Sequence, residues 1–367
     1  MINVILPVGI SFYTFQKMAY SIDVFRGKQK PTHSFLNFAL FVSFFPLLLA
    51  GPIERASALL PQIENSRQFN KDKFIRGLNL IFWGLFMKVF VADNLAVIVK
   101  QIYGNKNSTG VEYIIATWAF AFQIYGDFSG YTDIARGVSK CLGIDLIHNF
   151  KNPYFSIDPS DFWRRWHISL STWLRDYLYI PMGGNKTSRE KTYRNLMVTM
   201  LLGGLWHGSA WNFIIWGGFH GMLLCIHRFS KNIKIVFMES HSSIIIYMAK
   251  AFVMFQFICI GWIFFRAESY GQIKTIMYHI VTLSSIPIGQ AFDLLGKVSF
   301  FIAIPFAVML FQILKDNWVI WEFDCKYIKY VDFRCQPLYL KSFLYACVAY
   351  LLCFYGAKAQ SFIYLQF

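Results

Sequence analysis

Three histidines lie among apolar and aromatic residues, where an ionisable side chain is unusual. His207 lies in the stretch Gly203-Gly204-Leu205-Trp206-His207-Gly208, His220 follows thirteen residues later, and His167 ends an aromatic and basic segment. Histidine is suited to proton transfer near neutral pH, and ionisable groups within membrane-spanning sequence are costly and usually functional. Two interpretations of His207 are therefore open: a general base, or a structural histidine that donates to a neighbouring carbonyl.

The surroundings of the three histidines rank them as candidates. On one straight helix, His207 and His220 would lie about 20 Å apart, too far to serve one reacting atom. His207, between Trp206 and Trp211, has the less polar setting and is the predicted catalytic residue, whereas His220 is predicted to pack between helices or end one. A lone interfacial histidine such as His167 is usually part of an amphipathic face.

A second polar block extends from Gln123 to Arg136. Asp133 and Arg136 are three residues apart and can pair on one helical face. Because Asp127 and Asp133 follow an apolar span, exposing them to lipid would cost several kcal/mol, so the block is predicted to face the protein interior. It is either an ion pair that lets a helix end inside the protein or a polar wall of a donor or acceptor tunnel.

The composition is that of a polytopic membrane protein. Of 367 residues, 56% are hydrophobic, 19% aromatic and only 15% charged, against about 25% charged in soluble domains. The net charge of +15 would suggest nucleic acid in a soluble protein, but the basic residues occupy short loops between apolar runs and favour anionic lipid headgroups. The seven cysteines are scattered without a C-x-x-C pair, which indicates free thiols rather than disulfides or a metal site.

The apolar runs predict eight or nine spans in one all-α domain, residues 1–367. Their bounds are Leu6–Tyr20, Ser34–Ile53, Gly77–Lys100, Tyr113–Gly126, Leu196–Phe219, Ile244–Phe265, Val298–Leu314 and Ser342–Ala357. The run carrying His207 is long enough to cross about 30 Å of hydrocarbon as a helix, although its glycines could break it. The run 77–100 carries Lys88 and Asp93 and should therefore tilt, break or face protein.

The segment from Asp161 to Tyr177 is predicted to be one amphipathic helix, re-entrant or lying at the membrane interface. Its apolar residues recur at helical spacing: Phe162, Trp166, Leu170, Trp173 and Tyr177. Asp158-Pro159-Ser160 predicts its start and Pro181 its end.

The simplest chemistry that these residues support is general-base catalysis by histidine. No G-x-S-x-G elbow, P-loop, H-E-x-x-H or dinucleotide fingerprint is present. A histidine would deprotonate an acceptor hydroxyl as that hydroxyl attacks an activated acyl group.

Several ordered blocks resemble the membrane-bound O-acyltransferase (MBOAT) family, in the bacterial branch of alginate O-acetylation (AlgI) and teichoic-acid D-alanylation (DltB) proteins. The matching stretches are Leu6–Gln16, Phe45-Pro46 with Ala50–Ile53, Gln123–Arg136, Asp161–His167, Gly204–Gly208 and Gly261–Ala267. The ending Phe362–Phe367 resembles the family's C-terminus.

The resemblance implies a ring of tilted transmembrane helices, with re-entrant or amphipathic helices, around a central funnel. It implies acyl transfer from a cytoplasmic activated donor to an acceptor on the far side, with His207 as the catalytic histidine and His167 as the second functional one. His220 has a weaker family role. The residues predicted to bind substrate are Asp127, Ser129, Tyr131, Asp133, Arg136, Trp163, Arg164, Trp206 and Asn212.

The expected reaction is O-acetylation of an exported or cell-surface polysaccharide in the cell membrane, with acetyl-CoA as donor and with no tightly bound cofactor or metal. The expected partners are membrane lipid, the polysaccharide and an SGNH-type or other extracytoplasmic acetyltransferase, and not nucleic acid. Alternatives are D-alanyl transfer to teichoic acid, less favoured lysophospholipid acylation, an acyl conduit without chemistry of its own, and a nonfunctional truncated protein.

Members of this branch carry several further spans ahead of the block that begins at Leu6, close to the start of this chain. A truncated gene product, a fragment with a late start codon and a compact variant are the three interpretations. Helices missing from the family's set would expose interior surface to lipid, which would lower the stability of the remainder.

Overall fold

The computed structural model describes residues 9–49, 51–232, 244–282, 284, 286–318, 338–360 and 362. Within these residues all regular elements are helices, as predicted. Three helical stretches are long and apolar enough to cross a membrane, namely Lys71–Gly104, Ile244–Arg266 and Ile288–Leu310. Leu6–Val8, Ala50 and all of the C-terminal block except Phe362 lie outside the described residues.

Contacts divide the chain into two compact units. The first comprises residues 1–84, 128–278 and 361–367, and the second comprises residues 85–127 and 279–360. The single domain expected for residues 1–367 stays a prediction.

The first unit begins with α1 (Ile10–Phe25), α2 (Phe35–Ser43) and α3 (Ala56–Glu64). The span expected at 34–53 is therefore wrong as one helix: α2 ends at Ser43 and a 3-10 turn, η1 (Phe45–Leu47), follows. Pro46 in this turn has no N–H for the carbonyl four residues earlier, so the α-helical pattern cannot continue through it.

Helices α4 (Lys71–Leu85) and α6 (Gly110–Cys141) approach closely along a seam of glycines. A Cβ on Gly84 would lie 2.5 Å from the carbonyl oxygen of Gly130, and one on Gly137 would lie 2.6 Å from that of Gly77. Each helix carries its two glycines seven residues apart, so both lie on one helical face. Small residues allow this backbone-to-backbone packing, which lipid-embedded helices favour.

The predicted amphipathic helix at 161–177 is two helices, and this corrects the expectation of one. Asp158 accepts a hydrogen bond from the Asp161 amide (2.8 Å) and caps α7 (Pro159–Arg165), as predicted. Trp166 and His167 then interrupt the helix, because His167 adopts the left-handed conformation, with φ 42°. After it come α8 (Ile168–Leu174) and a π-helical turn, η4 (Arg175–Tyr179). The apolar residues of the stripe from Phe162 to Trp173 are buried.

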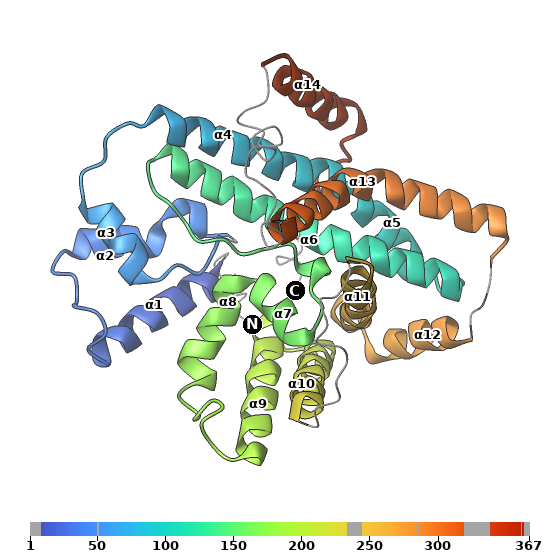
Figure 1. Ribbon diagram of the computed structural model, residues 1–367, viewed down its shortest axis with the longest axis horizontal. Coiled ribbons are helices and arrows are strands. Elements are labelled where there is room, and N and C mark those ends of the chain that lie inside the picture. The colour runs from blue at the N-terminus through green and yellow to red at the C-terminus, as the bar shows by residue number, and fades with distance from the viewer. Residues whose placement is uncertain are drawn as a thin grey trace, which may run out of the picture. The chain divides into compact units, whose positions relative to one another are not determined.

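The apolar run at 196–219 also breaks, at its glycines. Helix α9 (Arg189–His207) ends at His207 and α10 (Trp211–Asn232) begins four residues later. The ring of Phe213 lies against Gly208, where a Cβ would come within 2.5 Å of it. Helices α9 and α10 lie side by side (Figure 1), and α11 (Ile244–Arg266) and α12 (Tyr270–Val281) follow.

The second unit contains a π-helical segment, η2 (Phe86–Ala92), with α5 (Asp93–Gly104), the first part of α6, α13 (Ile288–Trp318) and α14 (Leu338–Tyr355). Lys88 Nζ lies 2.9 Å from Asp93 Oδ1 and 2.7 Å from Asp127 Oδ1. It also donates to the carbonyl oxygen of Gln360 (3.1 Å). Lys88 and Asp93 of the run 77–100 therefore face protein, and Asp127, 3% exposed, lies in the interior as predicted.

Candidate active site

The indole of Trp206 contacts both predicted catalytic histidines. Its ring centroid lies 5.9 Å from that of His167 and 4.8 Å from that of His207. His167 comes from the break between α7 and α8, and His207 is the last residue of α9. The segment at 159–174 thus folds back to the helix end that carries His207, which is the arrangement required for one shared site.

The two histidines differ in their access to the surroundings. His167 is 1% exposed, and Phe128 from α6 lies edge-on to its ring at 4.6 Å. His207 is partly exposed, with Trp216 of α10 at 5.1 Å and Phe265 of α11 at 5.2 Å. His207 is therefore the less buried of the two histidines, whereas His167 is enclosed by rings that include those of Trp206 and Phe128.

The backbone at His167 is held in a conformation that L-residues rarely adopt. Its φ of 42° and ψ of 54° lie in the left-handed helical region. That region costs about 1–2 kcal/mol for a residue with a Cβ, although histidine tolerates it better than most residues do. The surrounding hydrogen bonds must therefore maintain it.

His220 lies closer to the other histidines than a straight helix would allow. The chain breaks between α9 and α10, and the Trp216 ring contacts both His207 (5.1 Å) and His220 (5.0 Å). His220 is fully buried, stacked on Phe162 at 5.8 Å and edge-on to Trp163 at 5.2 Å. This surrounding is what the predicted packing role requires. Neither of its ring nitrogens has a hydrogen-bond partner within the described part of the chain.

The predicted pair in the polar block is present. Arg136 Nη1 lies 2.7 Å from Asp133 Oδ1, and Arg136 Nη2 donates to His148 Nε2 at 2.9 Å. Burial, followed by the charge of Arg136, lowers the pKa of His148, so its imidazole is neutral and can accept this bond. Arg136 is thus held by Asp133 within α6, and its bond to His148 connects α6 to the segment that follows it.

The other predicted residues of the block lie in different surroundings. Ser129 is buried on α6, Tyr131 lies 4.9 Å from the Phe362 ring, and Asp127 belongs to the Lys88 cluster. Phe128 of this block contacts a catalytic candidate, because its ring centroid lies 4.6 Å from that of His167. The substrate-binding roles of Asp127, Ser129 and Tyr131 stay predictions.

The remaining predicted substrate residues are not gathered at Trp206. Trp163 lies beside His220, and exposed Arg164 donates from Nε to the Ser160 carbonyl at 3.2 Å. Asn212 donates from Nδ2 to the Ala267 carbonyl (3.0 Å), which ties the start of α10 to the residue after α11. Their roles toward substrate also stay predictions.

The sequence did not predict most of the aromatic residues that contact the two histidines or Trp206. Phe12 lies 5.4 Å from Trp206, and Trp216 and Phe265 surround His207. Phe12 and Phe128 lie within the blocks that carry the family resemblance. Their apolar side chains gave no reason to separate a site residue from ordinary core.

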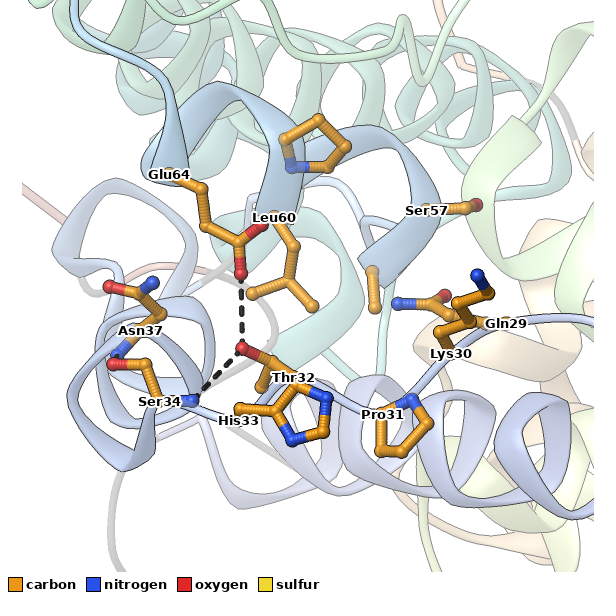
Figure 2. Close-up of a pocket in the computed structure, with 12 residues that line it drawn as sticks. Gln29, Lys30, Pro31, Thr32, His33, Ser34, Asn37, Ser57, Leu60 and Glu64 are labelled. Carbon is orange, nitrogen blue, oxygen red and sulfur yellow. Dashed lines mark hydrogen bonds between the residues drawn. The ribbon is translucent and has the colours of Figure 1, made fainter.

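A polar pocket lies elsewhere in the first unit, between the segment joining α1 to α2 and helix α3 (Figure 2). Its volume is about 510 Å³, and Thr32 Oγ1 donates across it to Glu64 Oε1 at 3.0 Å. The predicted site residues are absent from the lining described for it, so this pocket is separate from the histidine site.

The sequence between residues 25 and 267 matches the membrane-bound O-acyltransferase family (MBOAT), and the chain belongs to this family. The matched region includes both His167 and His207, so the predicted resemblance is confirmed.

The chain is similar to the probable alginate O-acetylase AlgI of Pseudomonas aeruginosa, with 45% identity over 75% of this chain and 51% of the relative. It is 37% identical to the peptidoglycan O-acetyltransferase of Helicobacter pylori, over 81% of this chain and 62% of the relative. It is 30% identical to the teichoic acid D-alanyltransferase of Bacillus subtilis, over 73% and 70%. The chain spans about half the length of the alginate O-acetylases it matches.

Proposed function

We propose that this chain is an O-acyltransferase of the cell membrane that transfers acetyl from acetyl-CoA to hydroxyl groups of an exported or cell-surface polysaccharide. The observation that carries the proposal is the partly exposed His207 at the end of α9, in contact with the Trp206 indole that also contacts His167. The names of the more similar relatives, alginate O-acetylase and peptidoglycan O-acetyltransferase, support acetyl as the group and a polysaccharide as the acceptor.

In the proposed reaction the neutral His207 imidazole accepts the proton of the acceptor hydroxyl. The hydroxyl oxygen forms a bond to the thioester carbonyl carbon, the carbon–sulfur bond breaks, and the proton passes to the departing thiolate. The products are an acetyl ester and coenzyme A. In this proposal the aromatic rings around His207 limit the access of water to the thioester and so protect it from hydrolysis.

D-alanyl transfer to teichoic acid is the second candidate. It is supported by the 30% identity to the teichoic acid D-alanyltransferase of B. subtilis, which is lower than the 45% identity to the alginate O-acetylase. A third candidate, an acyl conduit to an SGNH-type or other extracytoplasmic transferase, needs no base at position 207.

Purified chain in proteoliposomes tests these candidates. The expected result is transfer of labelled acetyl from acetyl-CoA to an alginate or peptidoglycan fragment, and no transfer of D-alanine from a charged carrier protein. His207→Gln, which keeps a polar side chain of similar size, should abolish the transfer. Full passage of acetyl to an added partner transferase by His207→Gln would support the conduit instead, and D-alanine transfer would support the second candidate.

A further inference from the structure

Helix α8 begins without the side-chain cap that helix starts usually have. Its N-cap residue is His167, whose side chain makes no capping hydrogen bond. The first amides of a helix have no partner within the helix, and Ser, Thr, Asn or Asp at the N-cap usually accepts from one of them. At α8 the histidine ring instead lies against Phe128 and Trp206.

Asn149, eighteen residues earlier, supplies the missing acceptors. Its backbone carbonyl accepts from the Ile168 amide at 2.9 Å, and its side-chain Oδ1 accepts from the Ser169 amide at 3.1 Å. One residue thus satisfies the first two amides of α8 from outside the helix. Asn149 is 1% exposed, so water does not replace it.

A second backbone hydrogen bond joins the segment around Asn149 to the segment around His167. The Lys151 amide donates to the Arg165 carbonyl at 2.9 Å, so residues 149–151 pair with residues 165–169 on either side of His167. The left-handed conformation of His167, with φ 42°, lies between these fastenings. Because that conformation is unfavourable by itself, it persists only where the neighbouring contacts fix it.

We infer that Asn149 is a positioning residue for His167, acting as a helix cap supplied from a distant segment. An ordinary N-cap residue would use its own side chain on the helix. Because Asn149 accepts from the first amides of α8, the N-cap residue does not need a capping side chain. A histidine can therefore occupy the N-cap position, with its ring against Trp206. The kinetic consequence rests on the proposed function, whereas the effect on His167 itself does not.

Chemical modification of the purified full chain in detergent tests the positioning directly. Diethyl pyrocarbonate modifies neutral histidines, and mass spectrometry quantifies each site. Asn149→Ala should raise the modification rate of His167 at least threefold, because the start of α8 loses one hydrogen bond and loosens. The His207 rate should change by less than twofold and serves as the internal reference. An unchanged His167 rate, including no modification in either protein, would overturn the inference.

Asn195→Ala is the matched control. Asn195 is equally buried and also fastens a distant loop, donating from Nδ2 to the carbonyls of Met182 (3.0 Å) and Gly184 (3.3 Å). It should lower stability as Asn149→Ala does and leave the His167 rate unchanged. A rise in both variants would mean that general loosening, not the cap, exposes His167.

Kinetics supply the second readout. Asn149→Ala should lower kcat by about three- to tenfold with KM for acetyl-CoA unchanged, as expected from the loss of one hydrogen bond. Asn149→Asp keeps the Oδ acceptor, and burial favours the protonated, neutral carboxyl at this position. This variant should therefore recover kcat and the wild-type His167 rate at least in part, which also tests the cap if Asn149→Ala yields too little folded protein. A His167 rate that rises while the wild-type chain transfers no acetyl would refute the proposed function alone. Loss of kcat in Asn149→Asp as large as in Asn149→Ala would refute the cap.

Discussion

Ionisable side chains are buried in this chain in two contrasting ways. In the second unit, Lys88 lies within 3 Å of two carboxylates, those of Asp93 and Asp127. In the first unit, the rings around His167 and His207 are those of Trp, Phe and His. A buried lysine or aspartate is tolerated only when it is paired, whereas a neutral imidazole needs no counter-charge. Pairing therefore makes the Lys88 cluster structural, whereas the aromatic surroundings favour the neutral imidazole of His207, which is the form that a general base needs.

The comparison predicts its largest effect at His207. His207→Ala should lower acyl transfer by about 10²–10⁴-fold, the range for loss of a general base, while the amount of folded protein stays unchanged. His207 lies at the end of α9 and is less buried than His167 or His220, so its removal should disturb the packed interior less than removal of either. Acetylated polymer in cells with matched protein levels measures this. Near-normal acetylation by His207→Ala would contradict the assignment of His207 as a general base.

The opposite behaviour is expected at Lys88. Lys88→Met leaves two buried carboxylates without their cation, and breaking such a buried pair costs about 3–5 kcal/mol. The variant should therefore give little folded protein in size-exclusion chromatography. Lys297→Met is the control, because the pair of Lys297 with Asp293 is exposed and contributes about 0–1 kcal/mol. Wild-type yield from Lys88→Met would show that the cluster is not what holds η2 and α5.

Substitution of Asp133 should also destabilise the protein, but less than substitution of Lys88. Asp133→Asn removes the counter-charge of Arg136, but the His148 bond remains, so the expected cost is about 1–3 kcal/mol. Folded protein should decrease, and the surviving fraction should stay partly active. Normal protein levels without activity would place this block in the reaction chamber instead.

The smallest effect concerns Glu54, which lies between η1 and α3, outside the helices. Its carboxylate accepts from the Ile147 amide at 2.6 Å, and burial raises its pKa from 4.5 to about 7. The folded state thus binds a proton that the unfolded state releases, so this stabilisation is present below pH 4.5 and lost as pH rises through about 7.

Glu54→Gln keeps the acceptor and removes the titration. Between pH 5 and pH 7 the wild-type chain should lose about 1–2 kcal/mol that the variant does not lose. Thermal unfolding in detergent at several pH values measures the difference. Parallel pH profiles for the two proteins would mean that Glu54 is ionised in the folded state.

The sequence predicted the helical class, the start of α7 at Asp158 and the Asp133–Arg136 pair, because each depends on residues close together in the chain. It did not predict the break at His167, since the left-handed conformation depends on Asn149 in another segment. The partner of Asp127 was missed for the same reason: Lys88 lies thirty-nine residues earlier. Within the candidate site, His207 was predicted from its chemistry and surroundings, and His167 from the family resemblance. The aromatic residues around them could not be separated from core packing.

The glycine seam between α4 and α6 has a mechanical consequence. Helices usually meet through side chains, whose rotamers form a deformable layer that lets one helix slide or roll on another. Between Gly77 and Gly137, and between Gly84 and Gly130, this layer is missing and backbone meets backbone. This pair of helices therefore forms a stiff joint. Sliding of these two helices past each other is therefore disfavoured, and motion within the first unit should involve elements that pack through side chains.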